Sequence, residues 1–134
     1  GVEIPAATLA RFWAMLAHYH GGVWNHAEFG RSLGESAQTV KRHLDILVGT
    51  YLVRALPPWH ENLGKRLVKH PKVYVRDSGL LHALLSIPTS AALLDHPIVG
   101  PSWEGFVVES LIACAPPQPS VIDAAAASLW LWRS

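Results

Sequence analysis

Glu104 and Glu109 are the residues whose type and spacing come closest to catalytic chemistry. They lie five positions apart within one largely apolar segment. Carboxylates can hold a divalent ion that activates a water molecule for hydrolysis. One helix cannot supply a whole site of this kind, and no strand with further acidic and lysine residues follows. We therefore interpret both glutamates as surface or helix-capping residues.

The eight histidines and the single cysteine do not predict a metal centre or a nucleophile. His18 and His20 are two residues apart, so on a helix they point to nearly opposite sides and cannot bind one ion together with His26. Cys114 has apolar neighbours, among which a thiol stays protonated and inert. We expect Cys114 to be a small buried side chain in a reducing compartment.

A polar helix face in the first half of the chain could contact nucleic acid. It carries Gln38, Thr39, Lys41 and Arg42. Glutamine and arginine can form two hydrogen bonds with adenine and guanine respectively, and a lysine beside them can contact phosphate. The alternative is a solvated face on which Lys41 and Asp45, one turn apart, interact weakly.

A second group of cations follows in a polar loop: Lys65, Arg66, Lys69 and Lys72. Such groups can neutralise phosphates and make binding depend on salt. The alternative roles are solubility or contact with an acidic protein partner.

Three helices are predicted to position the polar face. Apolar residues recur every three or four positions over residues 6–20. Asn25 can cap a second, short helix that ends at Gly34, and Glu28 can complete a capping box there. Ser36 can cap a third helix. Two helices joined by a tight turn are typical of a helix-turn-helix, although any three-helix bundle shows the same pattern.

A predicted β-hairpin after the third helix favours the helix-turn-helix over a plain three-helix bundle. Residues 52–56 have β character and stop at Pro57-Pro58, and residues 72–76 alternate like a strand. A winged helix carries its wing directly after the third helix. We therefore predict a mostly α fold, a winged helix-turn-helix with a two-stranded wing, followed by additional C-terminal helices.

The C-terminal part is predicted to be helical up to residue 115. Asp77 should cap one helix that ends before Pro88, and a short helix is expected around residues 90–95. The inner face of a last helix is expected to contain Trp103, Phe106, Val107, Ser110, Leu111 and Cys114. The predicted domains are a winged helix at 1–77, a helical appendage at 78–115 and an apolar tail, truncated or disordered, at 116–134.

Composition limits the classes of function. Half of the 134 residues are hydrophobic, which is enough for a core, and the formal charge of +1 gives no strong attraction to nucleic acid or anionic lipid. No segment approaches the roughly 18 apolar residues that span a bilayer, and no signal peptide is evident. We expect a cytoplasmic protein without membrane contact.

The ordered motifs resemble the C-terminal domain of unknown function that is attached to predicted prokaryotic AAA-type ATPases. The resemblance covers about residues 9–112 and is carried by the segments 36–44, 51–53, 62–67, 71–81 and 103–107. It implies a winged helix followed by the beginning of a restriction-endonuclease-like region, for which residues 78–115 would supply the start.

The chain also departs from this family. Gly64-Lys65 lacks the earlier glycine of a phosphate-binding loop and is followed by Arg66, so the ATPase module is absent from this chain. Members of the family continue into a sheet with acidic and lysine positions, whereas residues 116–134 are rich in proline and alanine.

These observations predict a non-catalytic winged-helix domain of an ATPase-associated protein, with no cofactor and no metal. It would bind nucleic acid, with double-stranded DNA as the candidate, or couple to the ATPase module of the full-length family protein. The predicted contact residues are Gln38, Thr39, Lys41, Arg42, Lys65, Arg66 and Lys69. The alternative is a protein-interaction or self-association module that uses the same helix and wing, with a homodimer formed through the apolar tail.

Overall fold

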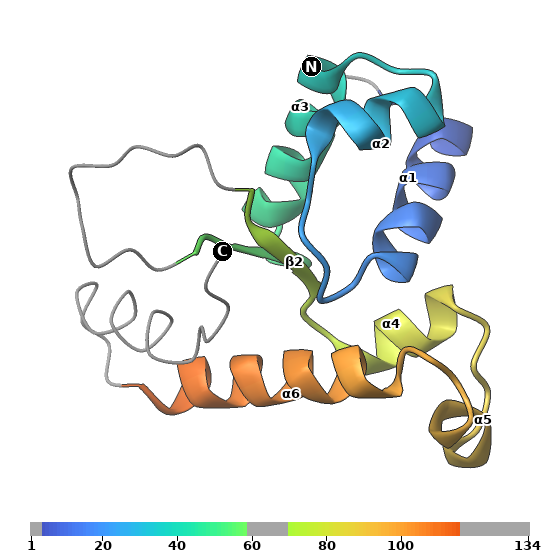
Figure 1. Ribbon diagram of the computed structural model, residues 1–134, viewed down its shortest axis with the longest axis vertical. Helices are drawn as coiled ribbons and strands as arrows, with labels where there is room; N and C mark the ends of the chain where they lie inside the picture. Colours follow the sequence, from blue (N-terminus) through green and yellow to red (C-terminus); the bar gives the residue numbers. More distant parts are fainter. Residues whose placement is uncertain (1–3, 59–69, 116–134) are drawn as a thin grey trace.

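Three helices in the first part of the chain form the helix-turn-helix. The computed structural model describes residues 4–58 and 70–115, and its first helices are α1 (Ala6–His18), α2 (His26–Leu33) and α3 (Ala37–Gly49) (Figure 1). The Asn25 side chain accepts hydrogen bonds from the backbone amides of Ala27 and Glu28, and Ser36 accepts one from Thr39. Both predicted N-caps are therefore confirmed.

The turn between α2 and α3 is also as predicted. Gly34 follows α2 in the left-handed region, at φ 72°, where a glycine has no steric penalty. The predicted capping box at the start of α2 is only half formed, because the Glu28 carboxylate makes no return hydrogen bond within the described residues.

Aromatic side chains fill the core between the three helices. Trp24 is 1% exposed and stacks on Phe29 with their ring centroids 3.7 Å apart, while Phe12 meets Trp24 edge-on at 5.7 Å. The indole NH of Trp24 donates to Nδ1 of His26 over 2.9 Å, so the buried ring leaves no polar group unsatisfied. Complete burial of a large apolar side chain stabilises a fold by about 1.5–3 kcal/mol.

The two predicted strands lie side by side behind α3. Strands β1 (Val53–Leu56) and β2 (Lys72–Val75) pair antiparallel, with Val53 opposite Val75 and Ala55 opposite Val73. This pairing confirms the predicted winged helix with its two-stranded wing.

Strand β2 is also bonded on its other edge, which the sequence did not reveal. Val73 donates its amide hydrogen to the Gly22 carbonyl over 3.1 Å and accepts from the Gly21 amide over 2.8 Å. The backbone amide of Trp24 donates to the Pro71 carbonyl over 2.8 Å. The connection between α1 and α2 therefore runs beside β2, and β2 lies between this connection and β1.

Three helices follow the sheet: α4 (Ser78–Leu84), α5 (Ser90–Leu94) and α6 (Val99–Cys114). Asp77 accepts a 2.7 Å hydrogen bond from the Leu80 amide, which confirms its predicted role as the cap of α4. In Figure 1, α6 runs along the side of the molecule opposite α2 and α3.

The face of α6 that packs on the fold is not the predicted one. Its buried residues are Ser102, Gly105 and Val108, whereas Trp103 is 66% exposed. Cys114 is also exposed, so the expectation of a buried thiol is wrong for the described residues. The reason is that small side chains let α6 approach strand β2 and the α1–α2 connection closely. A Cβ atom on Gly105 would lie 3.3 Å from Cδ1 of Tyr74 in β2 and 2.6 Å from Nε2 of His20.

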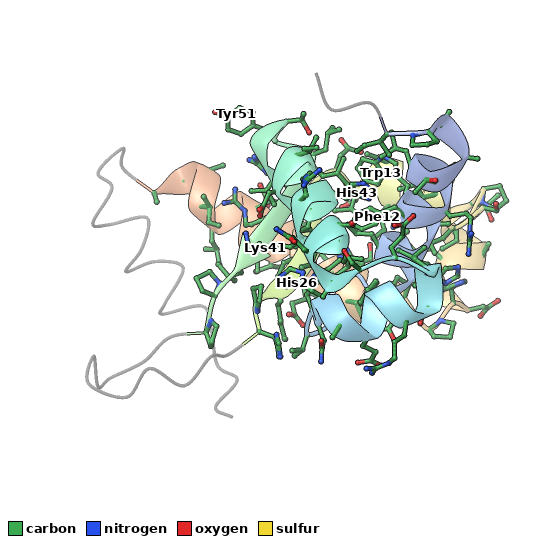
Figure 2. All side chains as sticks on the ribbon, turned by 90° about the horizontal axis from the view of Figure 1, so that it is seen from above. Phe12, Trp13, His26, Lys41, His43 and Tyr51 are labelled. Atoms are coloured by element: carbon green, nitrogen blue, oxygen red, sulfur yellow. The ribbon has the colours of Figure 1, made fainter. Side chains whose placement is uncertain are left out.

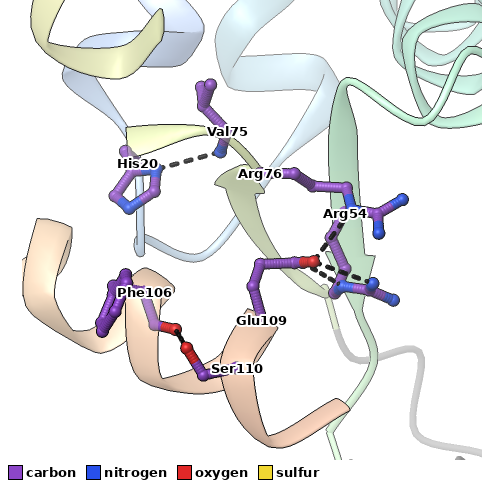
Figure 3. Close-up of polar contacts among 7 residues, drawn as sticks. All are labelled: His20, Arg54, Val75, Arg76, Phe106, Glu109 and Ser110. Carbon is purple, nitrogen blue, oxygen red and sulfur yellow. Dashed lines mark hydrogen bonds and ion pairs between the residues drawn. The ribbon is translucent and has the colours of Figure 1, made fainter. Parts of the chain in front are cut away.

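His20 connects α6 to strand β2. Its Nδ1 accepts from the Val75 amide over 2.9 Å (Figure 3). Its Nε2 lies 3.0 Å from the Pro101 carbonyl oxygen. Because the amide can only donate and the carbonyl can only accept, these partners fix a neutral imidazole with its proton on Nε2. Burial is the main cause that lowers the pKa of His20 from 6.5 to about 4.

This pKa predicts that the protein loses stability in mild acid. The unfolded state binds the His20 proton from pH 6.5 downwards and the folded state only near pH 4, so His20 lowers the free energy of unfolding by about 3 kcal/mol across that window. Urea denaturation of a His20→Gln variant should show lower stability at pH 7.5 and a flatter pH dependence between 6.5 and 4. A His18→Gln control, altered at an exposed site, should keep the wild-type slope; an unchanged slope in His20→Gln would contradict the assignment.

Candidate interaction surface

The polar face predicted on the third helix lies on the outside of α3. Gln38, Lys41 and Arg42 are exposed and Thr39 is half-buried. Figure 2 shows Lys41 and His43 on different sides of α3, with His43 turned toward Phe12. The helix therefore presents four of the seven predicted contact residues on one accessible surface.

Two of these four side chains already have partners within the chain. Nζ of Lys41 lies 2.7 Å from the Asp45 carboxylate, with both side chains about 60% exposed, so the pair contributes little to stability. The Thr39 hydroxyl lies 2.9 Å from the Ser36 hydroxyl, as part of the cap of α3. Within the described residues, Gln38 and Arg42 make no hydrogen bond or ion pair.

The surface around α3 carries balanced charge. Between residues 26 and 49, all six acidic and basic side chains are exposed, and three of each sign occur: Glu28, Glu35 and Asp45 with Arg31, Lys41 and Arg42. Such a mixture produces no net field that would draw a polyanion to this face.

The predicted basic wing is described only in part. Lys65, Arg66 and Lys69 lie outside the described residues. Lys72 lies on β2, where its Nζ is 3.0 Å from the Glu104 carboxylate. The Lys72 ammonium group therefore forms an ion pair with Glu104 of α6.

The glutamates of α6 bind the cations of the sheet. Glu109 accepts from Arg54 through both Nε and Nη2, the latter over 3.2 Å, and from Nε of Arg76 over 3.0 Å (Figure 3). Glu104 accepts from the Tyr74 hydroxyl as well as from Lys72. The expectation of a surface or capping role is therefore wrong for Glu109, whose side chain is 19% exposed. Glu104 does lie at the surface, with its side chain 45% exposed, and there it binds Lys72 and Tyr74 of β2.

Tyr74 is shielded from ionisation at this contact. Its ring is buried between the sheet and α6, and burial raises the pKa of its hydroxyl well above the usual value. The hydrogen bond to the Glu104 carboxylate acts in the same direction. Tyr74 therefore acts here as a permanent hydrogen-bond donor.

Two adjoining open clefts border the Glu109 network and were not predicted. One, of about 470 Å³, includes Asp77, Phe106 and Ser110 in its lining, and the other, of about 240 Å³, includes Tyr51; both share Glu109. The Asp77 carboxylate caps α4, and the Ser110 hydroxyl donates to the Phe106 carbonyl. Over residues 4–58 and 70–115 these clefts therefore offer no paired nucleophile and base.

The described residues also contain no group of three His, Cys, Asp or Glu side chains placed to hold a metal ion. His20 uses both ring nitrogens within the fold. No helix in the described ranges combines the length and the apolar character needed to cross a bilayer.

Comparison with known proteins finds relatives in mycobacteria. The profile of a family described as a domain of unknown function, DUF8612, matches residues 1–91. Uncharacterized proteins of Mycobacterium tuberculosis (strain H37Rv) and Mycobacterium bovis (strain AF2122/97) are each 48% identical over all 134 residues, and the chain covers 28% of the length of each. Neither the family nor these relatives indicate a catalytic activity. No solved structure matches the chain.

The ion pairs at Glu109 predict a measurable contribution to stability. Replacing Glu109 with Gln leaves two partly buried guanidinium groups without a carboxylate, which should lower the free energy of unfolding by about 2 kcal/mol. Asp45→Asn, which breaks an exposed pair on α3, should cost less than about 0.5 kcal/mol. Equal effects of the two substitutions in urea denaturation would show that Glu109 does not hold α6 in place.

Proposed function

The chain belongs to the DUF8612 family of domains of unknown function, and from its geometry we propose that it is a non-catalytic winged-helix module that binds a protein partner through α3. The observation that carries this proposal is the exposed pair of Gln38 and Arg42, which lie one turn apart and make no contact of their own within the described residues.

The chemistry of this face suits a protein surface. A protein interface has a polar rim, and its two surfaces carry complementary charges. Arginine is among the residues whose truncation costs most binding energy. The balanced charges around α3 fit such a surface better than they fit a polyanion. The exposed Lys41–Asp45 pair would lie at the rim of the contact.

The partner we propose is an ATPase module of the predicted prokaryotic AAA type, present in the same longer protein. The sequence motifs that resemble the C-terminal domain of such ATPases support this choice. The chain spans about 28% of the length of its mycobacterial relatives, so these proteins have room for a further module. On the same resemblance, α6 would be the first helix of a restriction-endonuclease-like region.

Double-stranded DNA is the second candidate partner. Gln38 lies in the first turn of α3 and Arg42 one turn later. The N-terminal part of a recognition helix is the part that contacts base edges, and these two residue types match adenine and guanine. Lys65, Arg66 and Lys69 would then contact phosphates from the predicted wing.

The test measures binding of this chain to the remaining part of the M. tuberculosis relative, expressed separately. Calorimetric titration should detect a complex that Arg42→Ala weakens about tenfold, the effect of losing one well-placed interfacial arginine. Arg31→Ala, which removes the exposed arginine of α2, should change the affinity less than about twofold, within the range of a rim residue.

The same variants distinguish the two candidates. If no complex forms, but short duplex DNA binds with an affinity that falls as salt rises and depends on Arg42, the DNA candidate replaces the protein partner. If the affinity for neither the protein fragment nor DNA depends on Arg42, α3 is not the contact surface.

A further inference from the structure

One face of α6 is apolar and uncovered in the described structure. Trp103, Phe106 and Leu111 are 66%, 52% and 42% exposed, and the rings of Trp103 and Phe106 stack with their centroids 5.6 Å apart. Cys114 extends the same exposed stripe by one turn. Exposed apolar patches of this kind mark surfaces that another element covers.

This face also lacks charge, for a reason that the structure makes clear. Glu104 and Glu109 are the only charged residues of α6, and both are held against the sheet by Tyr74, Lys72 and two arginines. The Ser110 hydroxyl donates to the Phe106 carbonyl over 2.7 Å, so it is satisfied within the helix. A helix that is apolar on the side away from its core contact is typical of one that is buried on both sides.

We propose that residues 128–132, with the sequence Ser-Leu-Trp-Leu-Trp, pack on this face of α6. The segment has no charged residue, and its alternating leucine and tryptophan side chains supply apolar area whichever side faces the helix. The stripe around Trp103, Phe106 and Leu111, which the sequence predicted as the inner face of this helix, would then be buried by the tail.

The length of the connecting chain permits this contact. α6 has 16 residues and is therefore about 24 Å long. The 12 residues from 116 to 127 could span up to about 40 Å if fully extended, so residues 128–132 can reach any point along the stripe. α6 ends at Cys114, and its C-cap Ala115 is already extended, at φ −70° and ψ 139°, so the chain leaves the helical path before residue 116.

An intramolecular contact is favoured over a second copy of the chain. A short tether holds the segment at an effective concentration of roughly millimolar, far above the concentration of a dilute protein. This proposal concerns α6 alone and does not depend on a partner for α3.

The test measures the reactivity of a single thiol on α6. In a Cys114→Ser background, Ser110→Cys places the thiol within the stripe at little cost in size. A maleimide should react with this thiol about tenfold faster when the tail also carries Trp130→Asp and Leu131→Asp. Neighbouring residues of a strand-like segment point to opposite sides, so one of the two aspartates would face α6 in either orientation. Ala10→Cys, at an exposed position of α1, should react equally fast with either tail.

Two other outcomes overturn the proposal. Protection of the Ser110→Cys thiol that increases with protein concentration would assign the face to a second copy of the chain. Fast reaction with the unaltered tail, equal to that with the Trp130→Asp and Leu131→Asp tail, would show that residues 128–132 do not cover α6.

Discussion

The hydrogen bonding of β2 on both edges is the constraint on which the rest of this structure depends. One edge pairs with β1, which fixes the end of α3, and the other pairs with residues 21–24, which fix the start of α2. Because a central strand satisfies its amides and carbonyls on both sides, a short two-stranded wing becomes the junction of the domain. His20 adds a further bond from this junction to the start of α6.

The charges of the sheet are used to hold α6, and this determines which surfaces stay available. Arg54, Arg76 and Lys72 all bind glutamates of α6, so the described face of the sheet presents few cations to a partner. The outer face of α3 points away from the sheet and from α6, so Gln38 and Arg42 stay accessible. The same arrangement turns both carboxylates of α6 toward cations next to the sheet, and the opposite stripe of α6 carries no charge.

Local signals in the sequence predicted most of the fold. Asn25, Ser36 and Asp77 act through bonds to amides two or three residues away, so their roles can be inferred without tertiary structure. The Lys41–Asp45 pair is equally local and appeared as the alternative to a DNA contact. The alternation of residues 72–76 likewise predicted β2, because period two is a property of the strand itself.

The orientation of α6 could not be predicted in the same way. Apolar periodicity indicates which face of a helix is buried, but it cannot show that Glu109 meets Arg54, 55 residues earlier, or that Gly105 lies against His20. The clefts beside Glu109 escaped prediction for the same reason, since distant segments line them. Three of the seven predicted contact residues, at positions 65, 66 and 69, lie outside the described residues.

Hydrogen exchange at the amides of Val73 and Val75 tests the central role of β2 most directly. These amides donate to Gly22 and His20, on the edge that the sequence did not predict. If β2 is the junction of the domain, both amides exchange only by global unfolding, with a free energy equal to that from urea denaturation. Exchange of both amides faster than that of Phe29 in α2 would show that this edge opens while the helices remain folded, and would contradict the account.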